Sequence, residues 1–174
     1  AKTKHEIGCH TFSHIDCSDQ NCPDEVFASE ITACQKAANK WGIQLKSFVH
    51  PGHTIGHIKN LAQFDFTSFR TDYKDTIGYP QLHEAGIWEL KNSAQIEYRK
   101  GWSSKYQIWR LSTIVNRAIK AKAVCNLWFH PQITDDDFVT KVFEGFFEYL
   151  NNHRNEVWIT TMYEYISYLN GQYL

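Results

Sequence analysis

Apolar side chains recur every three or four residues in several stretches of the chain, and this spacing predicts helices. The clearest stretch runs from Pro23 to Gly42. One face of this predicted helix carries the apolar residues Phe27, Ile31, Cys34, Ala38 and Trp41. Pro23 suits the first helical position and Gly42 suits the end of the helix, so this stretch has both helical spacing and end signals.

Shorter apolar runs separate this helix from the others, and we interpret them as strands. The predicted strands cover residues 4–9, 43–49, 66–70, 87–90, 124–129 and 157–160. The other predicted helices cover residues 55–63, 108–119, 134–150 and 161 onward, and the last two begin with a capping pattern. Residues 93–104 give no clear periodic signal. Strands that alternate with helices favour a mainly parallel sheet, open or closed into a barrel.

Histidines follow three of these predicted strands: His10, His50 and His130. In parallel α/β folds the ligand site lies at the carboxyl ends of the strands. We therefore expect the three histidines to lie near one rim of the sheet. As an alternative, His130 is a core histidine whose ring is hydrogen-bonded to the backbone.

His10 and His14 are four residues apart, and on a helical turn this spacing places two imidazoles on one face. Two such rings can bind one metal ion, although a hydrolytic site also needs a third protein ligand and a water. Thr11 follows His10, so the motif lacks the internal glutamate of a zincin, and a base must come from elsewhere. The pattern also occurs by chance in a histidine-rich chain.

The stretch from His5 to Asp16, HEIGCHTFSHID, resembles the His-Glu-Ile-Gly-x-His-Thr-x-x-His block of the polysaccharide deacetylases, the NodB-type carbohydrate esterases. Residues 127–131, Leu-Trp-Phe-His-Pro, resemble the late Leu-x-x-His-Pro block of that family. Residues 157–162 are similar to its closing strand-to-helix step. The three blocks follow one another in the family's order.

The resemblance implies a distorted, incomplete (β/α) barrel of the seven-stranded deacetylase type, formed by residues 1–174 as a single domain. It implies a divalent metal, usually zinc, bound by His10, His14 and an aspartate. The implied reaction is hydrolysis of N-acetyl groups on the amino sugars of a polysaccharide, with release of acetate. In that reaction His130 is the general acid that protonates the leaving amine.

The resemblance also implies two supporting roles, and two further residues are candidates on other grounds. Leu127 lines the pocket for the acetyl methyl group, and Thr11 braces the loop that carries the two metal ligands. Arg70 follows a predicted strand and takes part of the role of a family arginine that orients the catalytic carboxylate; a surface salt bridge is the alternative. Trp128 stacks on sugar rings, since strand alternation points it the same way as His130. Trp88 and Trp102 are weaker candidates for stacking, because most aromatic residues pack in cores.

The sequence departs from the family before His10, where an aspartate-bearing block is expected and none of the nine residues is Asp. We expect a fragment whose opening strand is missing, and little activity from this chain alone. Asp16 and Asp72 are the nearest replacement carboxylates. His50, His53 and His57 either supply further metal ligands or belong to a solvated loop.

Composition narrows the classes of function. The 174 residues suit one domain, and 18 Lys and Arg balance 19 Asp and Glu, which disfavours nucleic acid as a partner. No apolar run is long enough for a membrane span. Five cysteines, an odd number without a CxxC pair, favour buried thiols over a zinc ribbon and incline the compartment towards the cytoplasm rather than the cell envelope.

Two further functions remain open at this point. One is a catalytically inactive deacetylase-like domain that binds glycan or metal without turnover. The other is a metal-dependent amidase that acts on a substrate other than a sugar.

Overall fold

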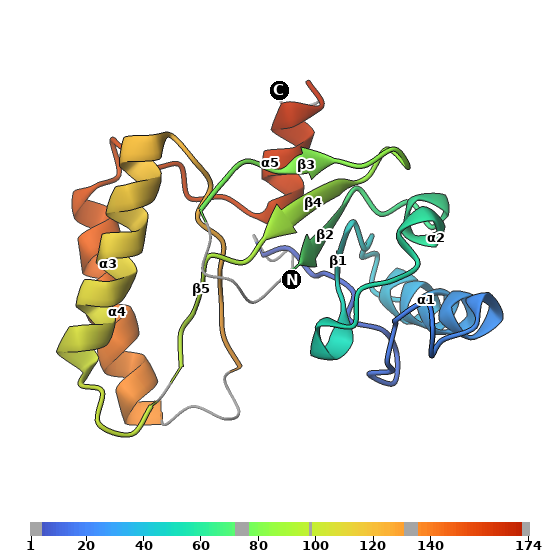
Figure 1. Ribbon diagram of the computed structural model, residues 1–174, viewed down its shortest axis with the longest axis horizontal. Coiled ribbons are helices and arrows are strands. Elements are labelled where there is room, and N and C mark those ends of the chain that lie inside the picture. The colour runs from blue at the N-terminus through green and yellow to red at the C-terminus, as the bar shows by residue number, and fades with distance from the viewer. Residues whose placement is uncertain (1–4, 72–76, 98, 131–135, 172–174) are drawn as a thin grey trace. The chain divides into compact units, whose positions relative to one another are not determined.

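The computed structural model describes residues 5–71, 77–97, 99–130 and 136–171 (Figure 1). Contacts between residues divide the chain into two compact units. Unit 1 comprises residues 1–72, 80–90 and 160–174, and unit 2 comprises residues 73–79 and 91–159. Each unit has a hydrophobic core of its own.

Unit 1 is built on a small mixed sheet with the strand order β1-β2-β4-β3. Its strands are β1 (Ser47–Val49), β2 (Ser68–Thr71), β3 (Gln81–Leu82) and β4 (Trp88–Lys91). β1 and β2 are parallel and pair Val49 with Arg70, whereas β3 and β4 are antiparallel. Cys9 adds a single parallel bridge to Phe48 on the other side of β1. The segment at Cys9 therefore lies beside β1.

The helices of unit 1 are α1 (Asp24–Asn39), α2 (Ile58–Gln63) and α5 (Met162–Leu169), with a short 3-10 helix, η1 (Pro51–His53). α1 carries Asp24 and Glu25 in its first turn, where carboxylates complement the helix dipole. It ends at Asn39, three residues before the glycine that was expected to stop it. Trp41 consequently lies outside the helix and is 82% exposed, so its predicted place on the core face is wrong.

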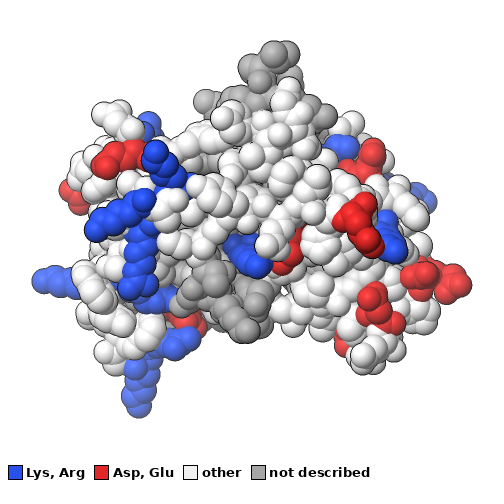
Figure 2. All heavy atoms as spheres, turned by 45° about the horizontal axis from the view of Figure 1, so that its top comes forward, with Lys and Arg blue, Asp and Glu red and all other residues white. Residues whose placement is uncertain are grey.

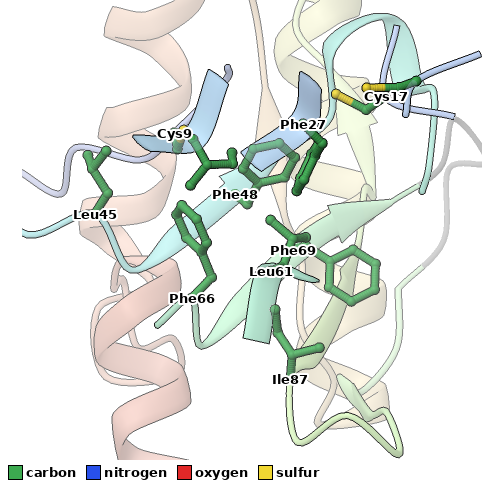
Figure 3. Close-up of a cluster of buried hydrophobic side chains, with 11 residues drawn as sticks. Cys9, Cys17, Phe27, Leu45, Phe48, Leu61, Phe66, Phe69 and Ile87 are labelled. Atoms are coloured by element: carbon green, nitrogen blue, oxygen red, sulfur yellow. The ribbon is translucent and has the colours of Figure 1, made fainter. Parts of the chain in front are cut away.

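The core of unit 1 consists mainly of aromatic and aliphatic side chains from α1 and the sheet (Figure 3). Its buried residues are Cys9, Cys17, Cys22, Phe27, Ile31, Leu45, Phe48, Leu61, Phe66, Phe69 and Ile87. Phe48 is fully buried, and its ring lies edge-on to Phe27 at 5.9 Å and to Phe66 at 5.5 Å between centroids. Edge-to-face contacts of this kind stabilise a core beyond the area they bury.

Unit 2 consists of two long helices, α3 (Ser104–Ala121) and α4 (Asp136–Asn152), and a two-stranded parallel sheet of β5 (Ala94–Gln95) and β6 (Leu127–Trp128). The helices pack against each other, and a Cβ on Gly145 of α4 would lie only 2.5 Å from Ile108 Cδ1 of α3. The core contains the buried residues Ala94, Ile96, Leu111, Val115, Phe138, Val142 and Phe146.

The predicted barrel is wrong. The described residues form five α-helices and two separate sheets of four and two strands, and the antiparallel β3–β4 pair breaks the parallel pattern that a (β/α) barrel needs. The predicted strand over 157–160 is irregular, and its Trp158 and Ile159 are exposed. The predicted strand over 124–129 shrinks to β6 and one bridge from Val124 to Gly78. Of the predicted strand over 4–9, Cys9 alone is paired among its described residues.

No helix among the described residues combines the length and the apolar character needed to cross a membrane.

Candidate functional site

The two histidines of the HxxxH motif meet in unit 1. Their ring centroids are 4.9 Å apart and their planes are nearly perpendicular, at 80°. The loop that carries them is not helical: Thr11 and His14 both have a left-handed backbone, with φ of 58°. The rings therefore come together through a turn rather than through the helical stacking that the spacing suggested.

A backbone carbonyl orients the first of these rings. His10 follows the bridge at Cys9, and its Nδ1 lies 2.7 Å from the carbonyl oxygen of Val49 at the end of β1. A carbonyl oxygen can only accept, so His10 donates from Nδ1, and when the ring is neutral its lone pair is on Nε2. Metal-binding histidines are commonly held in this way, with one nitrogen donating to the protein and the other available for the metal.

Glu30 of α1 holds the loop between the two histidines. Its Oε2 accepts hydrogen bonds from the backbone N–H groups of Phe12 and Ser13, at 2.8 and 2.7 Å, and its Oε1 accepts from the Ser13 hydroxyl at 2.7 Å. Burial raises the pKa of this carboxyl, but the hydrogen bonds from Ser13 and Phe12 outweigh it, and the net pKa is lowered. The Thr11 hydroxyl also accepts from the N–H of Ile15, at 3.3 Å.

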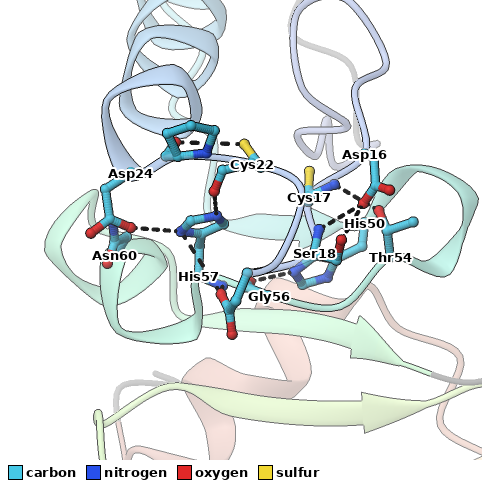
Figure 4. Close-up of polar contacts among 12 residues, drawn as sticks. Asp16, Cys17, Ser18, Cys22, Asp24, His50, Thr54, Gly56, His57 and Asn60 are labelled. Carbon is cyan, nitrogen blue, oxygen red and sulfur yellow. Dashed lines mark hydrogen bonds and ion pairs between the residues drawn. The ribbon is translucent and has the colours of Figure 1, made fainter.

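Asp16, one of the candidate replacement carboxylates, is engaged in the following loop. It accepts hydrogen bonds from the hydroxyl and the N–H of Ser18 (Figure 4). It also accepts one from the side-chain amide of Asn21, and these bonds lower its pKa. Asp72, the other candidate, lies outside the described residues. Within the described part of the chain, no three His, Cys, Asp or Glu side chains are placed to bind one metal ion. The described residues thus supply the histidine pair and not a complete set of zinc ligands.

The histidines after β1 are structural. His50 is buried, and its Nε2 donates to the carbonyl of Gly56 at 2.9 Å; burial lowers its pKa to about 4. His57 is also buried, with Nε2 2.9 Å from the Cys22 carbonyl and Nδ1 2.9 Å from Asp24 Oδ1 (Figure 4). A solvated loop is therefore the wrong description of His50 and His57. His53, between them, is half-buried.

Gly56 makes this arrangement possible. A Cβ at this position would lie 2.2 Å from the Cys17 carbonyl oxygen and 2.8 Å from the Asp19 nitrogen. The loop after β1 therefore touches the 17–19 loop backbone to backbone. Nearby, a hollow of about 320 Å³ is lined by residues from the loop before α1, from α1, α2 and the turn between β3 and β4. Its lining includes Asp19, Asp24 and Glu84 but neither of the paired histidines.

Burial also affects how easily the cysteine thiols ionise. Cys9, Cys17 and Cys22 are buried thiols in the core of unit 1, and burial raises the pKa of both Cys9 and Cys17 to about 12. Burial raises the pKa of Cys125 in unit 2 to about 11. Such thiols are poor nucleophiles because the reactive thiolate is strongly disfavoured.

Arg70 lies on β2 opposite Val49, the residue whose carbonyl holds His10. Its guanidinium is largely withdrawn from solvent, and burial lowers its pKa to about 10. The register thus places Arg70 on the strand next to the one whose Val49 carbonyl holds His10.

The remaining predicted site residues are in unit 2. Leu127 and Trp128 form β6 and His130 follows, with the rings of Trp128 and His130 in an edge contact at 5.1 Å. Trp128 is 8% exposed and Leu127 packs against the core of the unit. His10 and His14 belong to unit 1 and His130 to unit 2.

The two weaker candidates for sugar stacking, Trp88 and Trp102, both contact other side chains. Trp88 is half-buried and donates from Nε1 to Asn170 Oδ1 at 2.9 Å. Trp102 lies just before α3, with the guanidinium groups of Arg99 and Arg110 at 4.8 and 5.6 Å from its ring.

Sequence reasoning missed Glu30 and the pairing of His57 with Asp24. Neither has a local signal: Glu30 is 17 residues from Ser13, and Asp24 is 33 residues from His57. Comparisons of the chain with protein-family models, curated proteins and solved structures found no match.

Proposed function

We propose that this chain provides the metal-binding histidines and the proton-donating histidine of a metal-dependent hydrolase, one that removes N-acetyl groups from the amino sugars of a polysaccharide. The observation that supports it most is the His10–His14 pair, with Nδ1 of His10 committed to the Val49 carbonyl. This arrangement presets the tautomer that a metal ligand needs.

The two imidazole nitrogens of this pair suit zinc, but they are only part of a complete ligand set. His10 and His14 would supply two imidazole nitrogens, and a catalytic zinc site needs a third protein ligand that the described residues do not provide. A bound zinc ion would polarise the acetamide carbonyl and make a bound water acidic enough to attack it near neutral pH. The chain's own contribution is to hold the two rings, through Val49 and Glu30, before any ion arrives.

In this proposal His130 donates a proton to the departing amine. Loss of the amine requires a proton on the leaving nitrogen, and a protonated imidazole can give one near neutral pH. The edge contact with Trp128 restricts the orientation of the His130 ring. In this proposal Leu127 contacts the acetyl methyl group, and Arg70 orients the carboxylate that acts as base.

A binding domain without turnover is the second candidate. It is favoured by one observation: the described residues provide two metal ligands and no group of three. This candidate and the hydrolase share the histidine pair and differ in the carboxylate that completes it.

Metal titration tests the shared part. Zinc binding measured by calorimetry, or cobalt binding measured by its visible spectrum, should weaken at least tenfold in His10→Ala and in His14→Ala. His153→Ala is a matched control, because His153 is a histidine of unit 2 whose Nδ1 contacts the Tyr149 carbonyl. Unchanged zinc affinity in both site variants would refute the assignment of the pair.

Acetate release separates the two candidates. The substrate is an N-acetylglucosamine oligomer with zinc or cobalt present, and the enzyme is the chain together with any residues that its gene encodes before Ala1. Release that disappears in His130→Ala supports the hydrolase. Metal binding without release supports the binding domain, and release from non-sugar amides alone would identify an amidase.

A further inference from the structure

The positive charge of this nearly neutral chain is concentrated in one segment. Residues 99–125 contain seven Lys and Arg and no Asp or Glu. These basic residues are Arg99, Lys100, Lys105, Arg110, Arg117, Lys120 and Lys122. Figure 2 shows Lys and Arg side chains gathered on the side of the view where Figure 1 draws α3 and α4. The net charge of the whole chain is near zero, but the segment that contains α3 is strongly basic.

One face of α3 carries this charge together with exposed aromatic rings. We call the residues Trp102, Tyr106, Trp109, Arg117 and Lys120 the α3 ridge. From Tyr106 on they are three, eight and three residues apart, which keeps them on one face of the helix, and Trp102 precedes it. Trp109 is 61% exposed and Tyr106 is 42% exposed, and the centroids of successive rings are 5.0 and 5.7 Å apart. The ridge is thus a row of three rings followed by two cations.

The opposite face of α3 is already occupied. Leu111, Val115 and Ala118 are buried, and Ile108 packs onto Gly145 of α4. The apolar stripe of the helix therefore faces the core of unit 2, and an interfacial membrane helix would need that stripe for the lipid. A lipid surface is disfavoured as the partner for this reason.

The cations beside the rings are open to an anionic partner. Lys105, Arg117 and Lys120 are exposed, and none of the three pairs with a carboxylate of the described residues. Arg99 differs, since it forms an ion pair with Glu97 at 2.6 Å while lying over the Trp102 ring. Exposed rings offer apolar faces, and neighbouring Lys and Arg offer charge-assisted hydrogen bonds to carboxylates.

We propose that the α3 ridge binds an anionic polysaccharide that carries carboxylate groups. The rings of Tyr106 and Trp109 stack on the apolar faces of successive sugars, and Arg117 and Lys120 pair with their carboxylates. The choice of a glycan over another anionic polymer rests on the proposed function, because a ridge that holds the polymer keeps further acetamide groups near the enzyme. The ridge does not include His10, His14 or His130.

Binding to oligogalacturonate, a polymer of uronic acids, tests the proposal. Calorimetry and tryptophan fluorescence should show binding that weakens with salt, and a Tyr106→Ala/Trp109→Ala variant should lose at least tenfold in affinity. Arg117→Gln/Lys120→Gln is a second variant that leaves the rings in place, and a similar loss is expected. Trp41→Ala is the control, since Trp41 is an exposed tryptophan of unit 1, outside the ridge.

Four outcomes would overturn the proposal: equal binding of a neutral dextran, equal binding by both ridge variants and the wild type, tighter binding of a single-stranded oligonucleotide of equal charge, or tighter binding of phosphatidylglycerol vesicles. The His10→Ala/His14→Ala variant keeps the ridge intact and should bind oligogalacturonate like the wild type. If a protein without zinc binding or acetate release still binds oligogalacturonate through the ridge, the proposed function is refuted and this inference is not.

Discussion

Unit 1 and unit 2 are stabilised in different ways. Unit 1 surrounds a phenylalanine core with loops that bury His50 and His57 and bond them to distant carbonyls. Unit 2 is a pair of amphipathic helices whose buried faces repeat every three or four residues. Five of the six described non-glycine residues with positive φ are in unit 1, among them Thr11, His14 and His57.

This difference concerns the contacts that hold the loop with His10 and His14 in place. Left-handed backbone costs about 1 kcal/mol per residue and persists only where surrounding contacts enforce it. In unit 1 those contacts come from Glu30, Val49 and Gly56, which lie far along the sequence from the loops they hold. The unit with the candidate metal ligands is therefore the one with the strained backbone, whereas the helical unit presents its exposed ridge without strain.

Removing the central ring of each core should have the largest effect. Phe48→Ala and Phe146→Ala each delete a side chain that is no more than 1% exposed, and each should cost about 4 kcal/mol of unfolding free energy. Hydrogen exchange should accelerate in β1 and β2 for Phe48→Ala, and in α3 and α4 for Phe146→Ala. If exchange in β1 rose more in Phe146→Ala than in Phe48→Ala, the assignment of separate cores would be wrong.

Adding one methyl group at Gly56 should cost about 3 kcal/mol, because the new Cβ would collide with the backbone of Cys17 and Asp19. Chemical denaturation of Gly56→Ala measures this loss. Gly78→Ala is the control, since a Cβ there meets nothing within 4 Å. A destabilisation no larger than that of Gly78→Ala would show that the two loops of unit 1 can separate freely.

Acid should weaken unit 1 through His50. Its pKa is about 4 in the folded protein, against about 6.5 when unfolded, so the unfolded state binds more protons between these pH values and stability falls as the pH drops. The loss is about 3 kcal/mol between pH 6.5 and pH 4. His50→Gln keeps a donor for the Gly56 carbonyl and does not titrate. Its stability should therefore depend less on pH in this window, and an unchanged slope would rule out His50 as the cause.

The loop that carries His10 and His14 should loosen in Glu30→Gln. One charged acceptor of three hydrogen bonds is replaced by a neutral amide, and the expected local loss is about 1–2 kcal/mol. The wild-type contribution is present at neutral pH and is lost as the pH falls through the lowered pKa of Glu30. Hydrogen exchange at Phe12 and Ser13 reports it. Glu25→Gln, in the exposed first turn of α1, should leave these two amides unchanged.

Removal of one helix cap in each unit should cause the smallest losses of stability, and the two losses should be similar. Ser103 caps α3 in unit 2 by accepting from the Tyr106 N–H, and Thr161 caps α5 in unit 1 in a capping box with Glu164. Ser103→Ala and Thr161→Ala should each cost about 1 kcal/mol in thermal unfolding. A loss several times larger at Thr161 would mean that the cap also anchors other parts of unit 1.

Helices were predicted well because their signals are local. Amphipathic spacing and capping residues located α1, α3, α4 and α5 to within a few residues, and the Thr161 capping box is present as expected. Strands were predicted less well, because β3, β5 and β6 contain two residues each and no alternation can develop over two positions. The exposed Trp158 and Ile159 formed an apolar run that no neighbouring strand pairs with in the described residues.

The sequence by itself determined that two imidazoles occur four positions apart. Only the tertiary structure decided that these rings meet through a left-handed turn, that His10 donates to Val49, and that His50 and His57 are buried supports. It also decided against a closed barrel. The physical reason is that helix spacing and caps act within a few residues. The parallel pairing of β1 with β2 and the anchoring of the histidine loop instead join residues 17 to 39 positions apart, and no local pattern records them.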